Sequence, residues 1–234
     1  MNTKKYKKIF KRLNERHLRF KHVCEVGVYL PETSNVINFI QTGSRATLVE
    51  ADPVIIKKIK EFFANYDVSV VNVAIWETNG TVKLSKAAAS TFVTDLESSP
   101  AIINDSYEFS EENTFEVRSQ IFSEIDDGTI DLLSIDIEGS EWFVIKNLVS
   151  RPKVISVETH GKYYCNPHLK EILSWMERNN YKIWYKDSSD TVFVQNEFLK
   201  PSLIDTIQAH LVEVKLNWKR CKRRFQLEMK RYGT

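Results

Sequence analysis

Short β-rich runs alternate with amphipathic helical segments along most of this 234-residue chain, and this alternation constrains its fold more than any other feature. Apolar residues follow one another in the short runs, whereas they recur three and four positions apart in the segments between. Such an order is typical of an α/β architecture, a doubly wound and mostly parallel sheet with helices on both faces. Strands are predicted at 23–28, 46–50, 68–73, 131–136, 154–158, 182–186 and 191–195, of which the last two flank a polar turn and suit an antiparallel pair.

Helices are predicted between and beyond these strands. Asp52 followed by Pro53 is a favourable helix start, because Asp caps the free amides and Pro fits the first turn. Residues 81–85 and 115–118 alternate like strands and are predicted to pair as a hairpin-like insert, with 86–113 as a long loop that holds one short helix. The predicted helices cover 3–20, 32–41, 52–65, 139–148, 166–176 and a long stretch from 201 onward.

Basic residues gather at both ends of the chain, although the formal net charge is only +2. The predicted C-terminal helix carries an apolar stripe from Leu203 to Met229 between basic flanks. We expect this stripe to pack on the domain or on a second subunit, and a cationic helix also suits a membrane surface. Aromatic residues are not interleaved with the basic ones as on a stacking platform, so nucleic acid is not expected as a partner.

Cysteine usage and hydropathy indicate a protein of the reducing cytoplasm. Three scattered cysteines, Cys24, Cys165 and Cys221, give neither a disulfide framework nor the spacing of a metal site. No apolar stretch follows the charged N-terminus as in a signal peptide, and no apolar run approaches the length of a membrane span. We therefore expect a cytoplasmic localisation and no transmembrane segment.

Acidic residues and one glycine end the first two strands, at the edge of the sheet where doubly wound folds bind ligands. Gly27 permits a tight turn and a close approach of the backbone to a ligand, and the nearby Glu25 carboxylate suits the ammonium of a methionine moiety. Glu50 ends the second strand, where an acidic side chain can accept hydrogen bonds from both hydroxyls of a ribose. Because the spaced glycines of a pyrophosphate site are missing, these residues favour a ligand that has a ribose but no phosphate.

The end of the third strand offers small residues at the same edge of the sheet. Asn72, Val73 and Ala74 follow one another there, and their backbone amides suit the edge of an adenine ring. Packing in the core explains the same residues equally well.

The fourth strand leads into the densest carboxylate cluster of the sequence, which extends from Asp136 to Glu141. Glu141 fits the start of a helix, where acids are stabilising, whereas Asp136 still lies on the strand and is a site candidate. Glu158 and His160 end the fifth strand, so His160 is expected near Asp136 and both are candidates for a general base. Alternatively, Asp136, Glu158 and His160 together bind a divalent ion such as Mg²⁺, although their spacing is not diagnostic.

The run from Ile130 to Glu141 resembles the signature D-x-L-x-I-D-x-E-G-x-E of the FkbM-type methyltransferase family. The resemblance extends from about Val23 to Phe193, which is most of the chain. Other motifs of that family are matched at 49–53, 71–75, 79–82, 90–91 and 155–160.

This resemblance implies a Rossmann-like class I methyltransferase fold, with a doubly wound, mostly parallel seven-stranded sheet and added N- and C-terminal helices. It implies S-adenosylmethionine as cofactor and methylation of a hydroxyl on a sugar, a glycan or a related small molecule. The chain departs from the family at Glu25, where Asp is commoner, at Ala51, where Pro is commoner, and in the basic helix after Pro201. The resemblance and the strand ends together place the cofactor at Glu25, Gly27, Glu50, Ala51, Asn72, Val73, Ala74 and Asp136.

We expect a basic N-terminal helix at 1–22, a methyltransferase domain at 23–198 and a basic amphipathic helix at 199–234. Two other functions stay open. A nucleotide- or NAD-dependent enzyme on a similar sheet is disfavoured by the missing phosphate-binding glycines, and tight binding of NAD would support it. A non-catalytic module that acts through the basic helix would bind a polyanion with steep salt dependence and transfer no methyl group.

Overall fold

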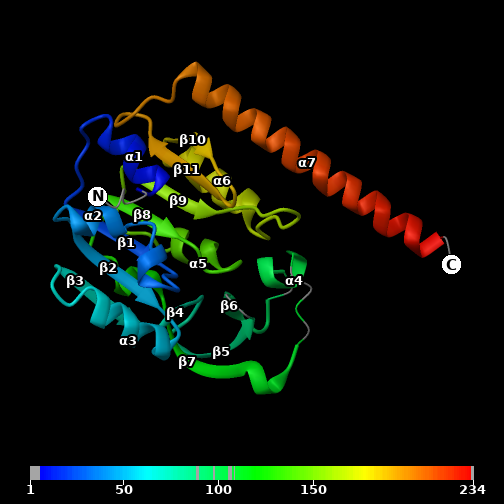
Figure 1. The fold of residues 1–234 in the computed structure, drawn as a ribbon, viewed down its shortest axis with the longest axis horizontal. Helices are drawn as coiled ribbons and strands as arrows, with labels where there is room; N and C mark the ends of the chain where they lie inside the picture. The colour runs from blue at the N-terminus through cyan, green and yellow to red at the C-terminus, as the bar shows by residue number, and fades with distance from the viewer. Residues whose placement is uncertain (1–5, 88–89, 97, 105–106, 108, 233–234) are drawn as a thin grey trace, which may run out of the picture.

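The computed structural model describes residues 6–87, 90–96, 98–104, 107 and 109–232, and its centre is a seven-stranded sheet (Figure 1). The strands of this sheet are β1 (His22–Val26), β2 (Arg45–Glu50), β3 (Val68–Asn72), β8 (Leu132–Ile135), β9 (Val154–Glu158), β10 (Tyr181–Lys186) and β11 (Asp190–Gln195). Their order in the sheet is β10-β11-β9-β8-β1-β2-β3. All neighbours from β9 to β3 are parallel, whereas β11 is antiparallel to both β9 and β10. The predicted α/β fold with a mostly parallel sheet is confirmed.

The order of the strands reverses next to β1. From β1 the chain builds β2 and β3 on one side, and it later returns to place β8 and β9 on the other side. Sheets of this kind bind ligands at the carboxyl ends of the strands beside such a reversal. The ends of β1, β2 and β8 are therefore the place to examine for a site.

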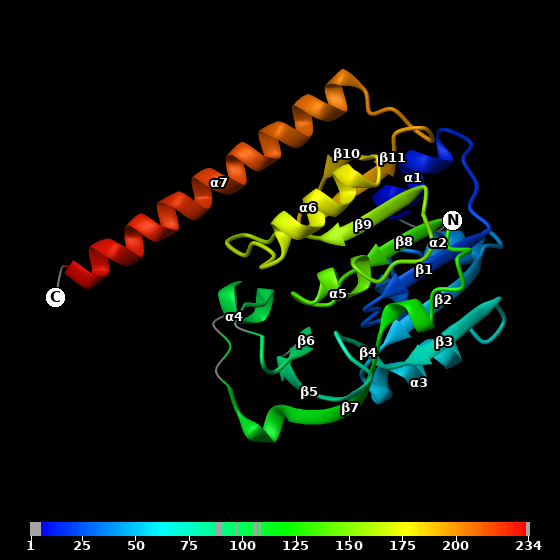
Figure 2. The same ribbon diagram turned by 180° about the vertical axis from the view of Figure 1, so that it is seen from behind.

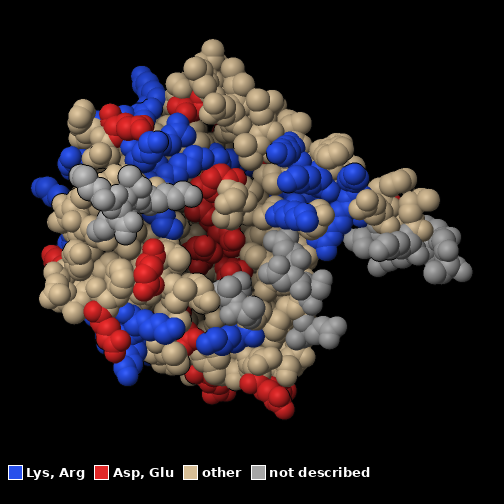
Figure 3. Space-filling view, in the orientation of Figure 1, with Lys and Arg blue, Asp and Glu red and all other residues tan. Residues whose placement is uncertain are grey.

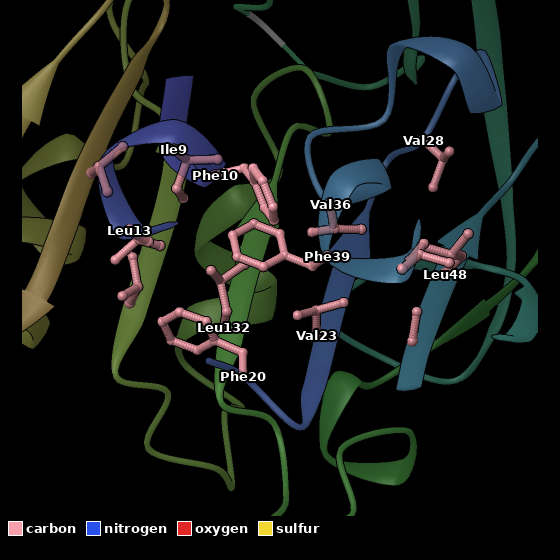
Figure 4. Packing of buried hydrophobic residues seen from close by; sticks show 14 of the residues in the cluster. Ile9, Phe10, Leu13, Phe20, Val23, Val28, Val36, Phe39, Leu48 and Leu132 are labelled. Atoms are coloured by element: carbon pink, nitrogen blue, oxygen red, sulfur yellow. The ribbon is translucent and has the colours of Figure 1, made fainter. Parts of the chain in front are cut away.

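Helices cover both faces of the sheet and build two apolar cores. Adjacent residues of a strand point to opposite faces, so Val23 packs in the first core and Cys24 in the second. Figure 4 shows the first core, in which Phe10 and Phe39 pack over Val23 and Leu132. The first core is covered by α1 (Lys8–Asn14), α2 (Ile37–Gln41) and α3 (Pro53–Phe62), and the second by α5 (Glu141–Ile145) and α6 (Leu169–Arg178).

A smaller sheet is inserted between β3 and β8 (Figure 2). Its strands are β4 (Ala74–Ile75), β5 (Gly80–Ala87), β6 (Ser90–Val93) and β7 (Thr114–Gln120), in the order β4-β7-β5-β6. The antiparallel pairing of β5 with β7 confirms the predicted pairing of 81–85 with 115–118. The predicted long loop at 86–113 also holds β6, α4 (Pro100–Asn104) and a 3₁₀ helix at Glu111–Asn113, while 88–89, 97, 105–106 and 108 lie outside the described residues.

The helices near the N-terminus are shorter than predicted. Residues 3–5 of the helix predicted at 3–20 lie outside the described residues, and α1 ends at Asn14. The chain then reverses at His17, where φ is 56°, so that Phe20 can pack against Phe39 at a ring distance of 5.6 Å. The helix predicted at 32–41 is divided into a 3₁₀ helix at Pro31–Thr33 and α2.

The C-terminal helix α7 (Leu203–Tyr232) contacts the domain through a different face from the predicted one. Ala209 and Leu216 are buried against the domain, whereas the stripe that includes Trp218 is exposed. The prediction that the stripe packs on the domain is wrong, because ion pairs of Arg12 with Asp205 and of Lys186 with Glu213 fix the opposite side of the helix to the domain. Figures 1 and 2 show α7 extending past the domain. No helix in the described part of the chain is long and apolar enough to cross a membrane.

Candidate functional site

The tips of β1, β2 and β8 lie side by side and line one cavity of about 390 Å³. The Gly27 amide donates to the Val49 carbonyl at 2.9 Å, and the Asp136 amide donates to the Val26 carbonyl at 2.9 Å. These two bonds continue the sheet ladder to its edge and bring Gly27, Glu50 and Asp136 to one level. Figure 3 shows acidic side chains gathered in a central hollow, with lysine and arginine side chains around it.

Gly27 is required by the backbone packing of the strand tips. Its φ is +85°, and a Cβ atom at this position would lie 1.8 Å from the carbonyl oxygen of Asp136. The sequence predicts that the backbone at Gly27 approaches a ligand closely. In the structure, the group that approaches it closely is the backbone of Asp136. Gly27 nevertheless lines the cavity, because the absent side chain leaves its backbone open.

Glu25 lies at the back of the cavity and is almost completely buried. Its carboxyl group accepts hydrogen bonds from the Ser34 hydroxyl and from the Asn35 amide, the latter at 2.7 Å. These bonds explain why the chain turns away from a helix at Ser34 and Asn35. Burial raises the pKa of Glu25 to about 7, despite the two hydrogen bonds, which act in the opposite direction.

Glu50 is held rigidly at the tip of β2. One carboxylate oxygen accepts from the amides of Val28 and Tyr29, both at 3.1 Å, and the other accepts from the Asp52 amide at 2.8 Å. A carboxylate offers about four lone-pair positions, so at least one remains for a group in the cavity. Because the three donors are backbone amides, the orientation of Glu50 is built into the fold.

The loop after β8 contains the carboxylate cluster that the sequence indicates. Glu138 and Gly139 have positive φ values of 58° and 114°, and the turn that they form folds the loop back on the cavity. Glu141 is buried below this turn and accepts hydrogen bonds from the amides of Ile137 at 3.1 Å and Gly139 at 3.0 Å. The Glu141 carboxyl therefore stabilises the loop that carries Asp136.

Asp136 lines the cavity with a carboxyl group to which no described residue donates a hydrogen bond. Its pKa is raised well above the ordinary value, first by burial and then by the negative charges of Asp190, Glu138 and Glu141. Carboxyls whose pKa is strongly raised by burial and by neighbouring negative charges cluster at functional sites.

Glu158 and Asp190 add two further carboxyls behind Asp136. They are opposite each other in the antiparallel pairing of β9 with β11, and both are buried. Asp190 lines the cavity and accepts hydrogen bonds from the hydroxyls of Ser156 at 3.0 Å and Ser189 at 2.9 Å. Burial and the nearby Asp187 raise its pKa to about 6. Glu158 does not line the cavity, and burial followed by the Asp136 charge raises its pKa well above the ordinary value.

The structure does not bring His160 into the cavity. Its ring is buried, with Nδ1 2.9 Å from the Thr159 hydroxyl and Nε2 3.2 Å from the Asp187 carbonyl oxygen. Burial lowers the pKa of His160, so the ring stays neutral and connects the end of β9 to the polar turn before β11. His160 therefore has a structural contact in this fold and does not line the cavity with Asp136.

The residues at the tip of β3 have two roles: Asn72 supports the tip of β2, and Val73 and Ala74 form part of the cavity wall. The Asn72 side chain donates to the carbonyls of Glu50 at 3.0 Å and Ala51 at 2.9 Å, so it supports the β2 tip from outside the cavity. Val73 and Ala74 line the cavity together with Ala51, and they give this part of the wall an apolar surface.

The family of this chain follows from comparison with known proteins. The model of the methyltransferase FkbM domain matches residues 25–183, which is more than half of the chain and includes β2, β3, β8 and β9 of the large sheet. The chain belongs to the FkbM methyltransferase family. The resemblance seen in the sequence is thereby confirmed, and the carboxylate loop after β8 lies within the matched residues.

Solved structures with a similar fold are methyltransferases of low sequence identity. The methyltransferase domain of bacterial CtHen1 has 10% identity and a TM-score of 0.46, over 82% of this chain and 97% of that one. Fibrillarin from Aeropyrum pernix, solved with bound S-adenosyl-L-methionine, has 10% identity and a TM-score of 0.41, over 75% and 66% of the two chains. A ribosomal protein methylase from Lactobacillus delbrueckii has 12% identity and a TM-score of 0.41, over 77% and 72%. No curated protein matches the sequence.

The FkbM domain shows no arrangement that would bind Mg²⁺ through the predicted ligands. Within the described residues, no group of three or more His, Cys, Asp and Glu side chains is placed to hold a metal ion. Of the three predicted ligands, only Asp136 lines the cavity, and His160 Nε2 contacts the Asp187 carbonyl oxygen at 3.2 Å.

Sequence reasoning missed the residues that complete the cavity from outside the strand tips. Lys7 and the turn of 187–190 form one side, and Thr91, Phe92 and Val93 of β6 form the wall opposite the sheet. Two signals pointed there: the polar turn at Asp187–Asp190 and the short motif at Ser90-Thr91. Neither signal shows by itself that its residues meet the tips of β1 and β8.

Proposed function

We propose that this FkbM domain is an S-adenosylmethionine-dependent O-methyltransferase that acts on a hydroxyl of a sugar, a glycan or a related small molecule. The observation that carries the proposal is the meeting of Glu25, Glu50 and Asp136 around one cavity, at the tips of three adjacent parallel strands. Acidic side chains at that edge suit a ligand that combines a ribose with positive charge.

The residues present fit this cofactor. The cavity volume lies in the range of small-molecule sites, about 300–1,000 Å³. The Glu50 carboxylate retains a lone pair that can accept from a ribose hydroxyl, and the apolar wall of Ala51, Val73 and Ala74 suits the adenine. Glu25 and Asp136 supply negative charge for the amino group and the sulfonium, and the same charges disfavour the pyrophosphate of NAD. S-adenosylmethionine supplies an electrophilic methyl group when it is bound.

A carboxyl of the cavity acts as the general base in this proposal. An alcohol is a weak nucleophile near neutral pH, and removal of its proton as it attacks accelerates the reaction. Asp136 suits the role because its pKa is raised and no described residue donates a hydrogen bond to its carboxyl. Asp190 is the second candidate, since its pKa of about 6 lies in the useful range and its carboxyl also lines the cavity.

The acceptor is proposed to enter between the large sheet and the insert. Ser189 and Thr91 offer hydroxyl groups on this side, and Phe92 offers an aromatic surface. Hydroxyl and carboxylate groups beside an aromatic ring are typical partners of sugar hydroxyls and sugar faces. The three free cysteines agree with a reducing compartment, so we place the reaction in the cytoplasm.

A methyl-transfer assay tests the proposal. The protein is incubated with S-adenosylmethionine carrying a labelled methyl group and with a panel of sugars and glycans, with and without EDTA. We expect label in at least one hydroxyl-bearing acceptor, and the EDTA arm shows whether a divalent ion takes part. Absence of S-adenosylmethionine binding, or transfer to amines in place of hydroxyls, would contradict the proposal.

A further inference from the structure

One face of α7 is apolar and exposed, and it lies opposite the face that touches the domain. The domain side is identified by Asp205, Ala209 and Leu216, which are all buried. Positions three and four residues apart share one side of a helix, so the apolar positions of α7 form a continuous stripe on the other side. The exposed stripe consists of Leu203, Ile207, Leu211, Val214, Trp218, Phe225 and Met229, each more than half exposed.

The length of this stripe is unusual for a surface that faces only water. At a rise of about 1.5 Å per residue, positions 203–229 span roughly 39 Å along the helix. Large contiguous apolar surfaces on folded proteins mark sites of interaction with proteins or membranes. The stripe is also straight, because it follows one helix without a break from Leu203 to Met229.

The charges beside the stripe are mainly positive. Lys215 and Lys222 are exposed and Lys219 is half-buried along one flank, and none of the three forms an ion pair with the described residues. By contrast, Asp205 and Glu213 point to the domain side, where Arg12 and Lys186 neutralise them. The outer surface of α7 therefore combines apolar side chains with uncompensated lysines.

We propose that α7 docks the protein, through this apolar stripe and its lysine flank, on the surface of a membrane that contains anionic lipids. An amphipathic helix with Trp, Phe and Leu on one face and lysines beside them lies in the headgroup region, with its apolar face inserted. Each lysine near an anionic surface adds to the attraction. A long straight stripe also matches the flat surface of a bilayer along its whole length.

The positive charge beside the stripe favours an anionic membrane over a second copy of this chain as the partner of α7. If two α7 helices packed through their stripes, the lysine flanks would lie beside another basic helix, with Glu228 as the one acidic residue among the described residues near the stripe. Such an arrangement lacks the complementary charges that stabilise paired helices. An anionic bilayer instead compensates Lys215, Lys219 and Lys222 at the same time.

The inner face of α7 is fixed near the cavity, so docking would also orient the site. Arg220 donates to the Tyr164 carbonyl at 3.2 Å, and Arg223 donates to the Ile103 carbonyl at 2.8 Å. Tyr164 also lies next to the loop that follows β8. A Cβ atom added at Gly139 of that loop would be 3.5 Å from the Tyr164 hydroxyl. A membrane bound by the outer face would therefore hold the cavity at a fixed distance and angle.

Vesicle co-sedimentation of the full chain tests this inference. Vesicles of phosphatidylcholine alone are compared with vesicles that contain phosphatidylglycerol as well. We expect binding to the anionic vesicles, a blue shift of Trp218 fluorescence that Trp218→Phe removes, and loss of binding at high salt. The triple variant Lys215→Glu, Lys219→Glu, Lys222→Glu should bind at least roughly a hundredfold more weakly.

The matched control reverses the exposed lysines of α3 (Lys57→Glu, Lys58→Glu, Lys60→Glu) and should bind like the wild type. A second variant, Leu211→Gln with Phe225→Gln, removes apolar surface without a change of charge and should also lose binding. All variants should keep wild-type affinity for S-adenosylhomocysteine, which shows that they fold. Equal binding of both triple variants, binding that does not depend on anionic lipid, or a salt-stable dimer without vesicle binding would overturn the inference.

Discussion

Single residues at the strand tips determine what the cavity can bind. Glu25, Glu50 and Asp136 were predictable because a carboxylate at the end of a buried parallel strand has few structural explanations. Asp190 was not predictable, because it follows an ordinary polar turn and meets Asp136 only after β11 has folded back beside β9. His160 does not line the cavity, because its ring is held between the Thr159 hydroxyl and the Asp187 carbonyl.

Replacement of Asp136 by Asn tests the general base. We expect the rate of methyl transfer to fall by about 10²–10⁴-fold, the typical contribution of a positioned base. Because the base must be ionised, wild-type activity should fall as the pH falls through the raised pKa of Asp136, and this acid limb should disappear in the residual activity of Asp136→Asn. Exposed Asp67→Asn serves as the control. Near-normal turnover of Asp136→Asn would remove this carboxyl from the mechanism.

The buried Glu25 carboxyl should make the ligand-free protein less stable as the pH rises. Its pKa is raised from an ordinary value of 4.5 to about 7, so the folded state binds the proton more tightly than the unfolded state does. Stability from this group is therefore full below about pH 4.5 and is lost as the pH rises towards 7, by up to about 3 kcal/mol.

The free energy of unfolding of the wild type and of Glu25→Gln, measured by denaturant titration from pH 4.5 to 7.5, checks this effect. The difference between the two proteins should change in favour of Glu25→Gln as the pH rises, while exposed Glu61→Gln should follow the wild type. A difference that is independent of pH would show that Glu25 is ionised in the folded protein throughout this range.

The contact between the tips of β1 and β8 depends on Gly27. A Cβ atom there would lie 1.8 Å from the Asp136 carbonyl oxygen, so Gly27→Ala must separate the two strand tips. We expect a loss of about 3–5 kcal/mol in the free energy of unfolding. Gly43→Ala is the matched control, because Gly43 also has a positive φ but has nothing within 4 Å, and it should cost only about 1–2 kcal/mol.

At the scale of the elements, the strands were predicted more accurately than the helices. Most strands of the large sheet are short runs rich in apolar and β-branched residues, and β9 begins and ends where its sequence indicates. The helices depended on tertiary contacts: α1 ends early because Phe20 packs back on Phe39, and the turn before α2 exists because Ser34 and Asn35 bind Glu25.

The start of α7 is fixed by a reciprocal cap that can be tested by itself. The Ser202 hydroxyl accepts from the Asp205 amide at 3.1 Å, while the Asp205 carboxylate accepts from the Ser202 amide at 3.1 Å. Ser202→Ala should cost about 0.5–2 kcal/mol and accelerate hydrogen exchange in the first turns of α7. Ser174→Ala, an exposed position within α6, should leave that exchange unchanged. Unchanged exchange in Ser202→Ala would mean that the ion pair of Arg12 with Asp205 is sufficient to hold the helix start.

At the scale of the whole molecule, two features stand out: the exposed apolar stripe of α7 and the cavity lined by acidic side chains. The sequence predicted that α7 is amphipathic, but it could not show which face meets the domain. Partly buried ion pairs decide that choice, since Asp205 and Glu213 bind Arg12 and Lys186 on the domain side. The cavity in turn concentrates negative charge that only a bound cation or protons can relieve.

The central claim is that the strand tips hold one nucleoside without phosphate, and calorimetric titration tests it most directly. S-adenosylhomocysteine should bind with one site per chain, and Glu50→Ala should weaken that binding by at least about tenfold, since a charged acceptor leaves the ribose hydroxyls without a partner. NAD should show no saturable binding under the same conditions. Tight binding of NAD together with no binding of S-adenosylhomocysteine would contradict the account.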